Sequence, residues 1–116
     1  MAVSSGDESS FLGSWMESHI QDSARVLRKP ILITEFGKSS RDGGYSTNVR
    51  DNFLGVVFNA VYGSARSGGP CAGALFWHVL AQGMDNFRDG YEIIFAECPS
   101  TTDVISQQSH KLSALR

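Results

Sequence analysis

Blocks of apolar and polar positions along this chain predict three helices and two short strands. A first helix is expected over residues 11–28, because apolar residues recur there at spacings of three to five. They are Phe11, Trp15, Ile20, Ala24 and Leu27, and Trp15 is expected to lie in the core. Pro30 ends this helix, since proline disfavours helical geometry in the preceding residue. Residues 1–10 carry no comparable pattern and are expected to form a disordered or loop N-terminus.

Two further helices follow from the same periodicity. One is expected over residues 49–66, before a Gly-Gly-Pro stop signal. Its apolar stripe comprises Val49, Phe53, Val56, Val57, Ala60 and Val61. The last helix is expected from Pro99 to Leu115, with Ser100 three residues before Asp103 in the manner of a capping box.

Unbroken apolar runs over residues 30–34 and 71–77 predict strands at 31–35 and 71–77 that are buried on both faces. Glu35 comes directly after the first run. Strands joined by a helix are parallel and nearly always cross over right-handedly. Glu35 and Trp77 should therefore emerge at the same edge of one sheet. Polar residues 38–48 form a loop, and residues 78–98 form a long one that contains Phe87 and Tyr91. These elements indicate an α/β fold.

Composition and charge narrow the function. The chain has 116 residues, 41% of them hydrophobic, and 10 basic against 12 acidic side chains give a net charge of -2. The basic residues are scattered, and Lys38, Arg41, Arg50 and Arg66 are expected to be solvated surface charges. Nucleic acid and anionic membranes are therefore poor partners. The first ten residues have no signal-peptide pattern, and no apolar run approaches the roughly 20 residues of a membrane span.

The cysteines and histidines show no metal-ligand spacing, and no cofactor is implied. Cys71 and Cys98 could form a disulfide only if the fold brings their Cα atoms within roughly 7 Å. His78 could hydrogen-bond a ligand or a loop, or serve as a structural histidine. Asp85 and Asn86 are expected to brace the long loop.

A carboxylate and an indole at the ends of neighbouring parallel strands suit carbohydrate chemistry. Sugar rings stack on Trp, and glycosidic cleavage passes through an oxocarbenium-like state that a carboxylate can stabilise or trap. Glu35 could instead be a structural acid paired with Lys38 or Arg41, and Trp77 could be a core residue.

Several motifs resemble the C-terminal portion of plant endo-β-mannanases of glycoside hydrolase family 5. They are Lys-Pro-Ile-Leu-Ile-Thr-Glu-Phe-Gly-Lys-Ser at 29–39, Ala-Leu-Phe-Trp-His at 74–78, Gly-Met-Asp-Asn-Phe at 83–87 and Asp-Gly-Tyr-Glu at 89–92. The resemblance implies that residues 11–116 form part of a (β/α)8 barrel, namely strands 7 and 8, their helices and the preceding helix. It also implies that Glu35 is the nucleophile, that Trp77 is the substrate-binding platform, and that the parent enzyme acts on β-mannan in the cell wall.

The family's general acid/base, a Glu after Asn, has no counterpart in these residues. Retaining hydrolysis needs two carboxyl groups about 5–5.5 Å apart, so the chain alone is expected to be inactive. The alternative is a non-catalytic product that binds mannan or another protein chain, with Trp77, Phe87 and Tyr91 as its aromatic set. Open sheet edges would allow association with another chain.

Overall fold

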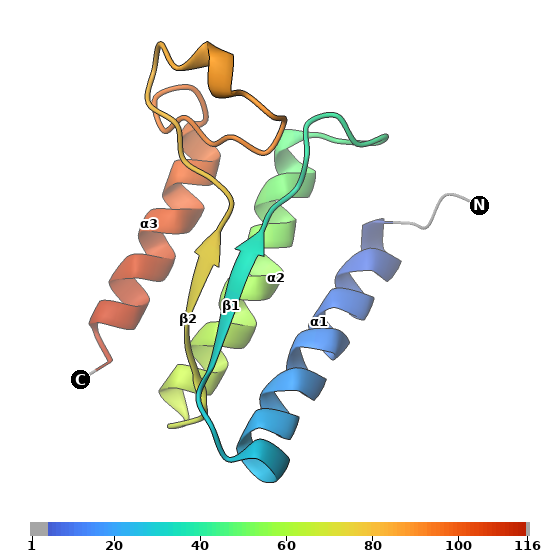
Figure 1. Ribbon diagram of the computed structural model, residues 1–116, viewed down its shortest axis with the longest axis vertical. Helices are drawn as coiled ribbons and strands as arrows, with labels where there is room; N and C mark the ends of the chain where they lie inside the picture. Colours follow the sequence, from blue (N-terminus) through green and yellow to red (C-terminus); the bar gives the residue numbers. More distant parts are fainter. Residues whose placement is uncertain (1–4, 116) are drawn as a thin grey trace.

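The computed structural model describes residues 5–115, in which a two-stranded parallel sheet is covered on one face by helices (Figure 1). The elements are α1 (Ser5–Asp22), the π-helical turn η1 (Ser23–Leu27), β1 (Ile31–Phe36), α2 (Thr47–Arg66), β2 (Cys71–Phe76), the 3-10 turn η2 (Asp85–Phe87) and α3 (Pro99–Ser113). This order confirms the predicted mixed α/β arrangement. None of the helices in residues 5–115 is long and apolar enough to cross a lipid bilayer.

The start of α1 differs from the prediction. Residues 5–10 are helical rather than a loop, while residues 1–4 lie outside the described residues. Asp7 and Glu8 stand in the first helical turn, where negative side chains stabilise the positive end of the helix dipole. The helix therefore begins before the apolar pattern that was used to predict it.

The buried face of α1 also differs from the prediction. Trp15 is 43% exposed and Phe11 is 72% exposed, so the expectation that Trp15 lies in the core is wrong. Met16 is buried in place of Trp15, whereas Ile20 is buried as the pattern predicted, and both pack against α2. Ser23 continues this face because its hydroxyl donates a 2.7 Å hydrogen bond to the carbonyl of Lys29. The polar residue Ser23 is thus buried where the pattern had predicted the apolar Ala24.

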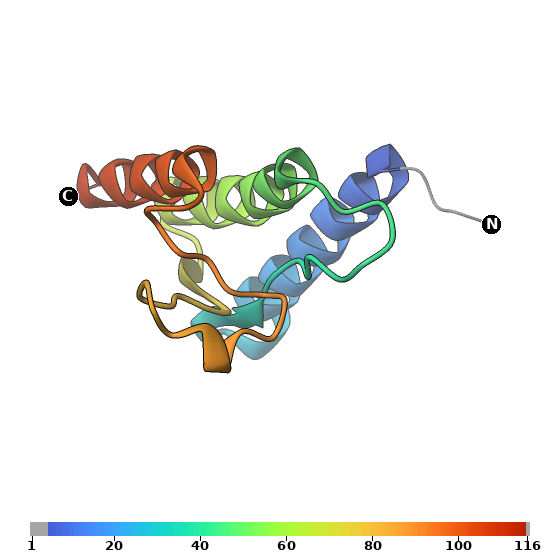
Figure 2. The same cartoon turned by 90° about the horizontal axis from the view of Figure 1, so that it is seen from above.

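The helix α2 is the centre of the packing, between α1 and α3 (Figure 2). Towards α1, its Val57 and Val61 form a cluster with Met16, Ile20 and Cys71. Towards α3, its Leu54 and Phe58 pack with Ile93, which lies in the loop after β2. Burial of these aliphatic and aromatic side chains supplies most of the driving force for folding.

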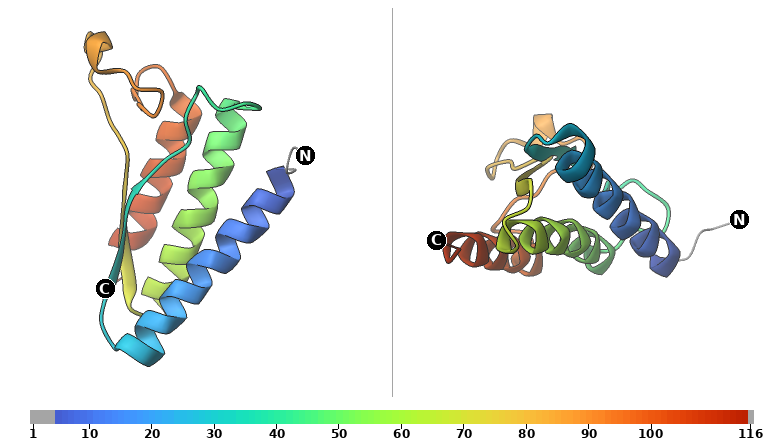
Figure 3. Two further views of the ribbon diagram at one scale, coloured as in Figure 1. Left: turned by 45° about the vertical axis from the view of Figure 1, so that its right-hand side comes forward. Right: turned by 90° about the horizontal axis from the view of Figure 1, so that it is seen from below.

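The sheet is covered on one face only, with the helices on a single side of it (Figure 3). Leu32 is 53% exposed and Leu75 is 57% exposed, so the prediction of strands buried on both faces is wrong for residues 5–115. The radius of gyration, 15.0 Å, exceeds the value of about 13 Å expected for a compact domain of this length. The described chain thus leaves one apolar layer unpacked.

The start of α3 lacks the predicted capping box. Cys98 is the N-cap residue and makes no side-chain capping bond, while Pro99 occupies the first turn. The Ser100 hydroxyl donates to Asp51 on α2 instead, at 2.6 Å. Cys98 and Cys71 are both free thiols, so they form no disulfide, and burial raises the pKa of Cys71.

Candidate active site

Glu35 is the extra residue of a β-bulge at the end of β1. Its neighbours pair with consecutive residues of β2, Thr34 with Leu75 and Phe36 with Phe76. Glu35 itself has a φ of 54°, in the left-handed region that costs a side-chain-bearing residue about 1–2 kcal/mol. Bulges re-aim side chains and are frequent beside active sites. The backbone thus turns the carboxylate out of the regular strand alternation.

One pocket of about 410 Å³ brings the two predicted site residues together. It is lined by Glu35, Phe36, Gly37, Phe53, Trp77 and Tyr91. Glu35 is exposed and Trp77 is 47% exposed, so neither points into a dry core. The prediction that both residues emerge at one sheet edge is confirmed. Phe53 comes from α2 and Tyr91 from the long loop. The sequence patterns had not predicted that these two residues line one pocket.

The carboxylate of Glu35 forms no hydrogen bond or ion pair within residues 5–115, and both suggested cationic partners are engaged elsewhere. Lys38 Nζ lies 3.3 Å from a carboxylate oxygen of Glu8. Arg41 donates from Nη2 to the carbonyl of Arg88 at 3.5 Å. The interpretation of Glu35 as a structural acid paired with Lys38 or Arg41 therefore has no contact to support it.

Asp89 holds the indole of Trp77 from the side of the long loop. Trp77 Nε1 donates to Asp89 Oδ2 at 2.9 Å, and His78 Nε2 lies 3.1 Å from Oδ1. The backbone N–H of Tyr91 donates to the same Oδ1 at 2.9 Å. The hydrogen bond from Trp77, then that from Tyr91 and that from His78, lower the pKa of Asp89 to about 2. His78 thus contacts the loop, one of the roles left open for it.

The loop around Asp89 is braced by charged groups. Arg88 lies 2.7 Å from Asp85 through Nε and 3.1 Å from Glu97 through Nη2. These hydrogen bonds raise the pKa of Arg88. Asp85 therefore braces the loop as predicted, while the same expectation for Asn86 stays a prediction. The sequence offered no spacing that marked Asp89 as a partner of Trp77.

Three potential metal-ligating groups meet beside the pocket. One ligand atom each of His78, Asp89 and Glu92 lies within 4.8 Å of the others. Their oxygens already accept hydrogen bonds: Asp89 from Trp77 and Tyr91, and Glu92 from two loop amides. Burial opposes the charged form of Glu92, but hydrogen bonds from its own backbone N–H and from those of Gly90 and Asp89, together with the charge of Arg88, outweigh burial and lower its pKa. The arrangement fits a loop brace.

Arg50 corrects the expectation of solvated surface charges. It is 7% exposed and donates from Nη2 to the Thr101 hydroxyl at 3.0 Å. Its guanidinium also lies 5.9 Å from the ring centre of Tyr45 and its Nη1 donates to the carbonyl of Glu92 at 3.5 Å. Arg50 thus links α2 to the start of α3 and to the long loop.

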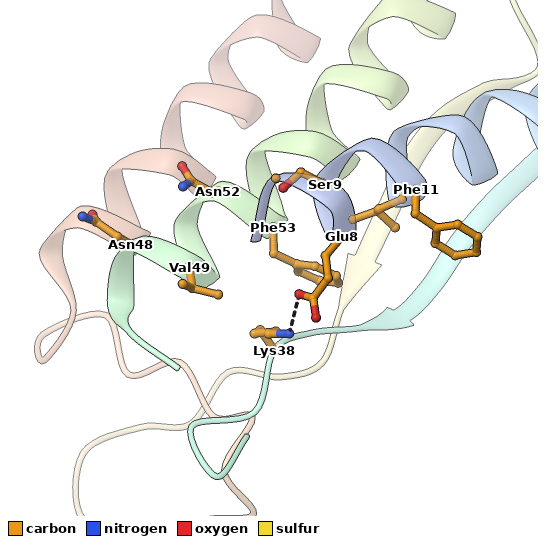
Figure 4. Close-up of a pocket in the computed structure, with 10 residues that line it drawn as sticks. Glu8, Ser9, Phe11, Lys38, Asn48, Val49, Asn52 and Phe53 are labelled. Atoms are coloured by element: carbon orange, nitrogen blue, oxygen red, sulfur yellow. Dashed lines mark hydrogen bonds and ion pairs between the residues drawn. The ribbon is translucent and has the colours of Figure 1, made fainter. Parts of the chain in front are cut away.

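A second pocket, of about 440 Å³, lies between the starts of α1 and α2 (Figure 4). Phe11 and Phe53 provide apolar lining, and Asn52 contributes an amide. Its charged groups, Lys38 and Glu8, form an ion pair across it. They compensate each other, whereas the carboxylate of Glu35 is uncompensated in its own pocket. Of these two pockets, the Glu35 pocket is therefore the one whose carboxylate has no cationic partner among residues 5–115.

Comparison with known proteins shows which sequences this chain resembles. The chain is 53% identical over 105 residues to mannan endo-1,4-beta-mannosidase 1 of Oryza sativa subsp. japonica. The aligned region covers 90% of this chain and 24% of the relative. It is 51% identical over 106 residues to mannan endo-1,4-beta-mannosidase 7 of Arabidopsis thaliana, covering 91% of this chain and 25% of the relative. The chain is homologous to part of the plant mannan endo-1,4-β-mannosidases.

A third mannosidase, mannan endo-1,4-beta-mannosidase 4 of Solanum lycopersicum, is 50% identical over 101 residues, covering 87% of this chain and 25% of the relative. The chain thus spans about a quarter of the length of these mannosidases. No protein-family model matches it.

Proposed function

We propose that this chain is the C-terminal segment of a retaining endo-β-1,4-mannanase of glycoside hydrolase family 5. The observation that carries the proposal is the pocket shared by Glu35 and Trp77 where β1 and β2 end. In a (β/α)8 barrel the active site lies at the carboxyl ends of the strands, and β1 and β2 would be strands 7 and 8. The parent enzyme would cleave mannan, galactomannan or glucomannan in the plant cell wall, outside the cell.

In this proposal Glu35 is the nucleophile. One carboxylate oxygen bonds to the anomeric carbon while the glycosidic bond breaks and its oxygen takes a proton from a second carboxyl group. Trp77 supports the apolar face of the sugar ring at the point of cleavage. Because no cation among residues 5–115 pairs with it, the Glu35 carboxylate is available for attack. The residues of this chain supply no matching acid, so the chain alone is inactive.

A chimera tests the role of Glu35. In the rice mannan endo-1,4-beta-mannosidase 1, the segment aligned with this chain is replaced by residues 11–116. The chimera should release reducing ends from galactomannan, and Glu35→Gln should lower kcat by about 10³-fold or more, because covalent catalysis loses its nucleophile. Glu17→Gln is the matched control, since Glu17 is exposed on α1 and bonds only Gln21 among the described residues.

Covalent trapping identifies the attacking atom directly. A mannobioside with fluorine at C2 and a dinitrophenolate leaving group needs no acid, because the phenolate departs as an anion with the bonding electron pair. The chimera should gain one glycosyl group, and peptide mapping should locate it on Glu35. Labelling of another carboxylate, or full activity of Glu35→Gln, would reject the proposed nucleophile. Galactomannan hydrolysis by the isolated chain would reject its inactivity.

The second candidate function is mannan binding without catalysis, which the exposed aromatic side chains favour. Trp77 is 47%, Phe87 66% and Tyr91 37% exposed. Titration of the isolated chain with mannohexaose in a Trp15→Phe background would follow Trp77 fluorescence alone. Saturable quenching that Tyr91→Ala weakens would support binding, whereas a flat signal up to millimolar sugar would exclude it.

A further inference from the structure

The indole of Trp77 is half exposed, yet its polar atom is fixed by a residue far along the chain. Its Nε1 donates to Asp89 Oδ2 at 2.9 Å across a sequence separation of 12 residues. An exposed tryptophan ordinarily satisfies this N–H with water. A direct charge-assisted bond is shorter and more directional, and therefore limits rotation of the ring.

The carboxylate of Asp89 is itself held on its other side. Oδ1 accepts the backbone N–H of Tyr91 at 2.9 Å and lies 3.1 Å from His78 Nε2. These donors, together with Trp77, keep the pKa of Asp89 at about 2. The acceptor is thus anionic at neutral pH and cannot swing away without losing several hydrogen bonds.

The backbone that carries Asp89 is tied to the segment after β1. Glu92 Oε2 accepts the N–H groups of Asp89 at 3.1 Å and Gly90 at 2.7 Å. The carbonyl of Gly90 accepts the N–H of Ser40 at 2.8 Å. A Cβ at Gly90 would lie 2.7 Å from the Ser39 hydroxyl, so the two loops approach closely. Asp89 therefore has a fixed position relative to the Glu35 pocket.

From this geometry we infer that Asp89 is a positioning residue, which holds the Trp77 indole in the orientation that presents its ring to a sugar in the Glu35 pocket. The part of this inference that concerns sugar binding rests on the proposed function. A side chain that is ordered before the ligand arrives does not lose its freedom on binding, so preorganisation strengthens affinity. Asp89 acts through Trp77 and does not itself contact the reacting atoms.

Nuclear magnetic resonance of the isolated ¹⁵N-labelled chain tests the positioning without any sugar. Asp89→Ala should shift the indole N–H resonance of Trp77 upfield and speed its exchange with water, while that of Trp15 stays unchanged and reports an intact fold. Asp85→Ala is the matched control, because Asp85 lies in the same loop and bonds Arg88 instead. An unchanged Trp77 indole resonance in Asp89→Ala would overturn the inference.

Mannohexaose affinity tests the functional half. In the chimera made inactive by Glu35→Gln, so that the sugar is not cleaved, Asp89→Ala should raise the Kd about fivefold, the size expected for one net hydrogen bond, and Asp85→Ala should leave it nearly unchanged. Asp89→Asn keeps one acceptor oxygen and should lie between them, and it replaces the alanine variant if that variant unfolds. A shifted indole with unchanged affinity would overturn the inference. Failure of the Glu35→Gln chimera to bind without a change at Asp89 would instead reject the proposed function, and the indole resonance would still decide the positioning.

Discussion

The backbone N–H of Trp77 donates a hydrogen bond of 2.8 Å to the carbonyl oxygen of Phe36. This bond continues the parallel pairing past the end of β2, so Trp77 lies beside the residue that follows Glu35. It explains why a carboxylate and an indole separated by a helix in the sequence line one pocket. The same close approach limits what residue 37 can be.

Gly37→Ala should destabilise the protein and displace Trp77. A Cβ on residue 37 would lie 2.6 Å from the Trp77 carbonyl oxygen, so the two strand ends must move apart. We expect the free energy of unfolding, measured in urea, to fall by about 1–3 kcal/mol, as for other overpacked sites. A Cβ at Gly63 on α2 would have no atom within 4 Å, so Gly63→Ala should raise the free energy of unfolding by up to about 1 kcal/mol. A Gly37→Ala protein as stable as wild type would contradict the close approach.

Glu35→Gly should be more stable than Glu35→Ala, by about 1 kcal/mol in urea unfolding. The φ of 54° at residue 35 crowds any Cβ, whereas glycine adopts it freely. At an ordinary strand position the order is reversed, because glycine gives the unfolded chain more entropy. The same pair of substitutions at Leu32, within β1, serves as the control and should favour alanine. Equal stability of the two variants at residue 35 would mean that the bulge carries no strain.

The contact between Trp77 and Asp89 should persist to low pH. The pKa of Asp89 is lowered from its ordinary 3.8 to about 2, so its contribution to stability is complete above about pH 4 and is lost as the pH falls towards 2. In a Trp15→Phe background, Trp77 fluorescence should change within that window. Asp89→Asn should abolish this component of the titration. A midpoint near pH 4 would show that the hydrogen bonds do not hold the carboxylate.

Arg50→Met should lower the free energy of unfolding by about 1.5–3 kcal/mol, the range for hydrogen bonds to charged groups. Arg50 is 7% exposed and its donors reach Thr101 on α3 and the carbonyl of Glu92. Arg66→Met, at an exposed site near the end of α2, should change it by less than about 0.5 kcal/mol. Chemical denaturation followed by circular dichroism measures both. Equal effects would show that the buried contacts of Arg50 contribute nothing.

Periodicity predicted the helices and strands because these depend on short-range patterns, and the shared sheet edge followed from the rule that strands joined by a helix are parallel. The parallel connection required Glu35 and Trp77 to lie at one edge, and the bulge geometry then turned Glu35 into the pocket. The predicted stripe was wrong at Ala24, because the neighbouring Ser23 of η1 is buried and its hydroxyl finds an acceptor in the carbonyl of Lys29. A local hydrogen bond of this kind is not visible in a hydropathy pattern.

Long-range polar contacts were the other part that the sequence could not predict. Asp89 bonds Trp77, which lies 12 residues away in the sequence. Arg50 bonds Thr101, which lies 51 residues away. Their pairing depends on how the loop and α3 fold back, which no spacing encodes. The capping box failed for the same reason, since the Ser100 hydroxyl bonds Asp51 on another helix.

The bare face of the sheet yields a prediction that separates the isolated chain from a complete barrel. Leu32 and Leu75 are more than half exposed there, and exposed apolar patches beside unpaired strand edges promote association. Leu32→Lys with Leu75→Lys should therefore reduce concentration-dependent association of the isolated chain in light scattering. Val26→Lys with Leu27→Lys on η1 is the control for added charge, because these residues are as exposed but lie outside the sheet.

In the chimera the same two lysines should be harmful, because there they should lower the stability of the protein. If β1 and β2 are strands of a closed barrel, the face that carries Leu32 and Leu75 packs inside it, and buried unpaired ammonium groups strongly destabilise a protein. The thermal midpoint of the chimera should fall sharply with the sheet lysines and little with those on η1. A chimera that tolerates both pairs equally would show that this face stays open to solvent and would contradict the barrel.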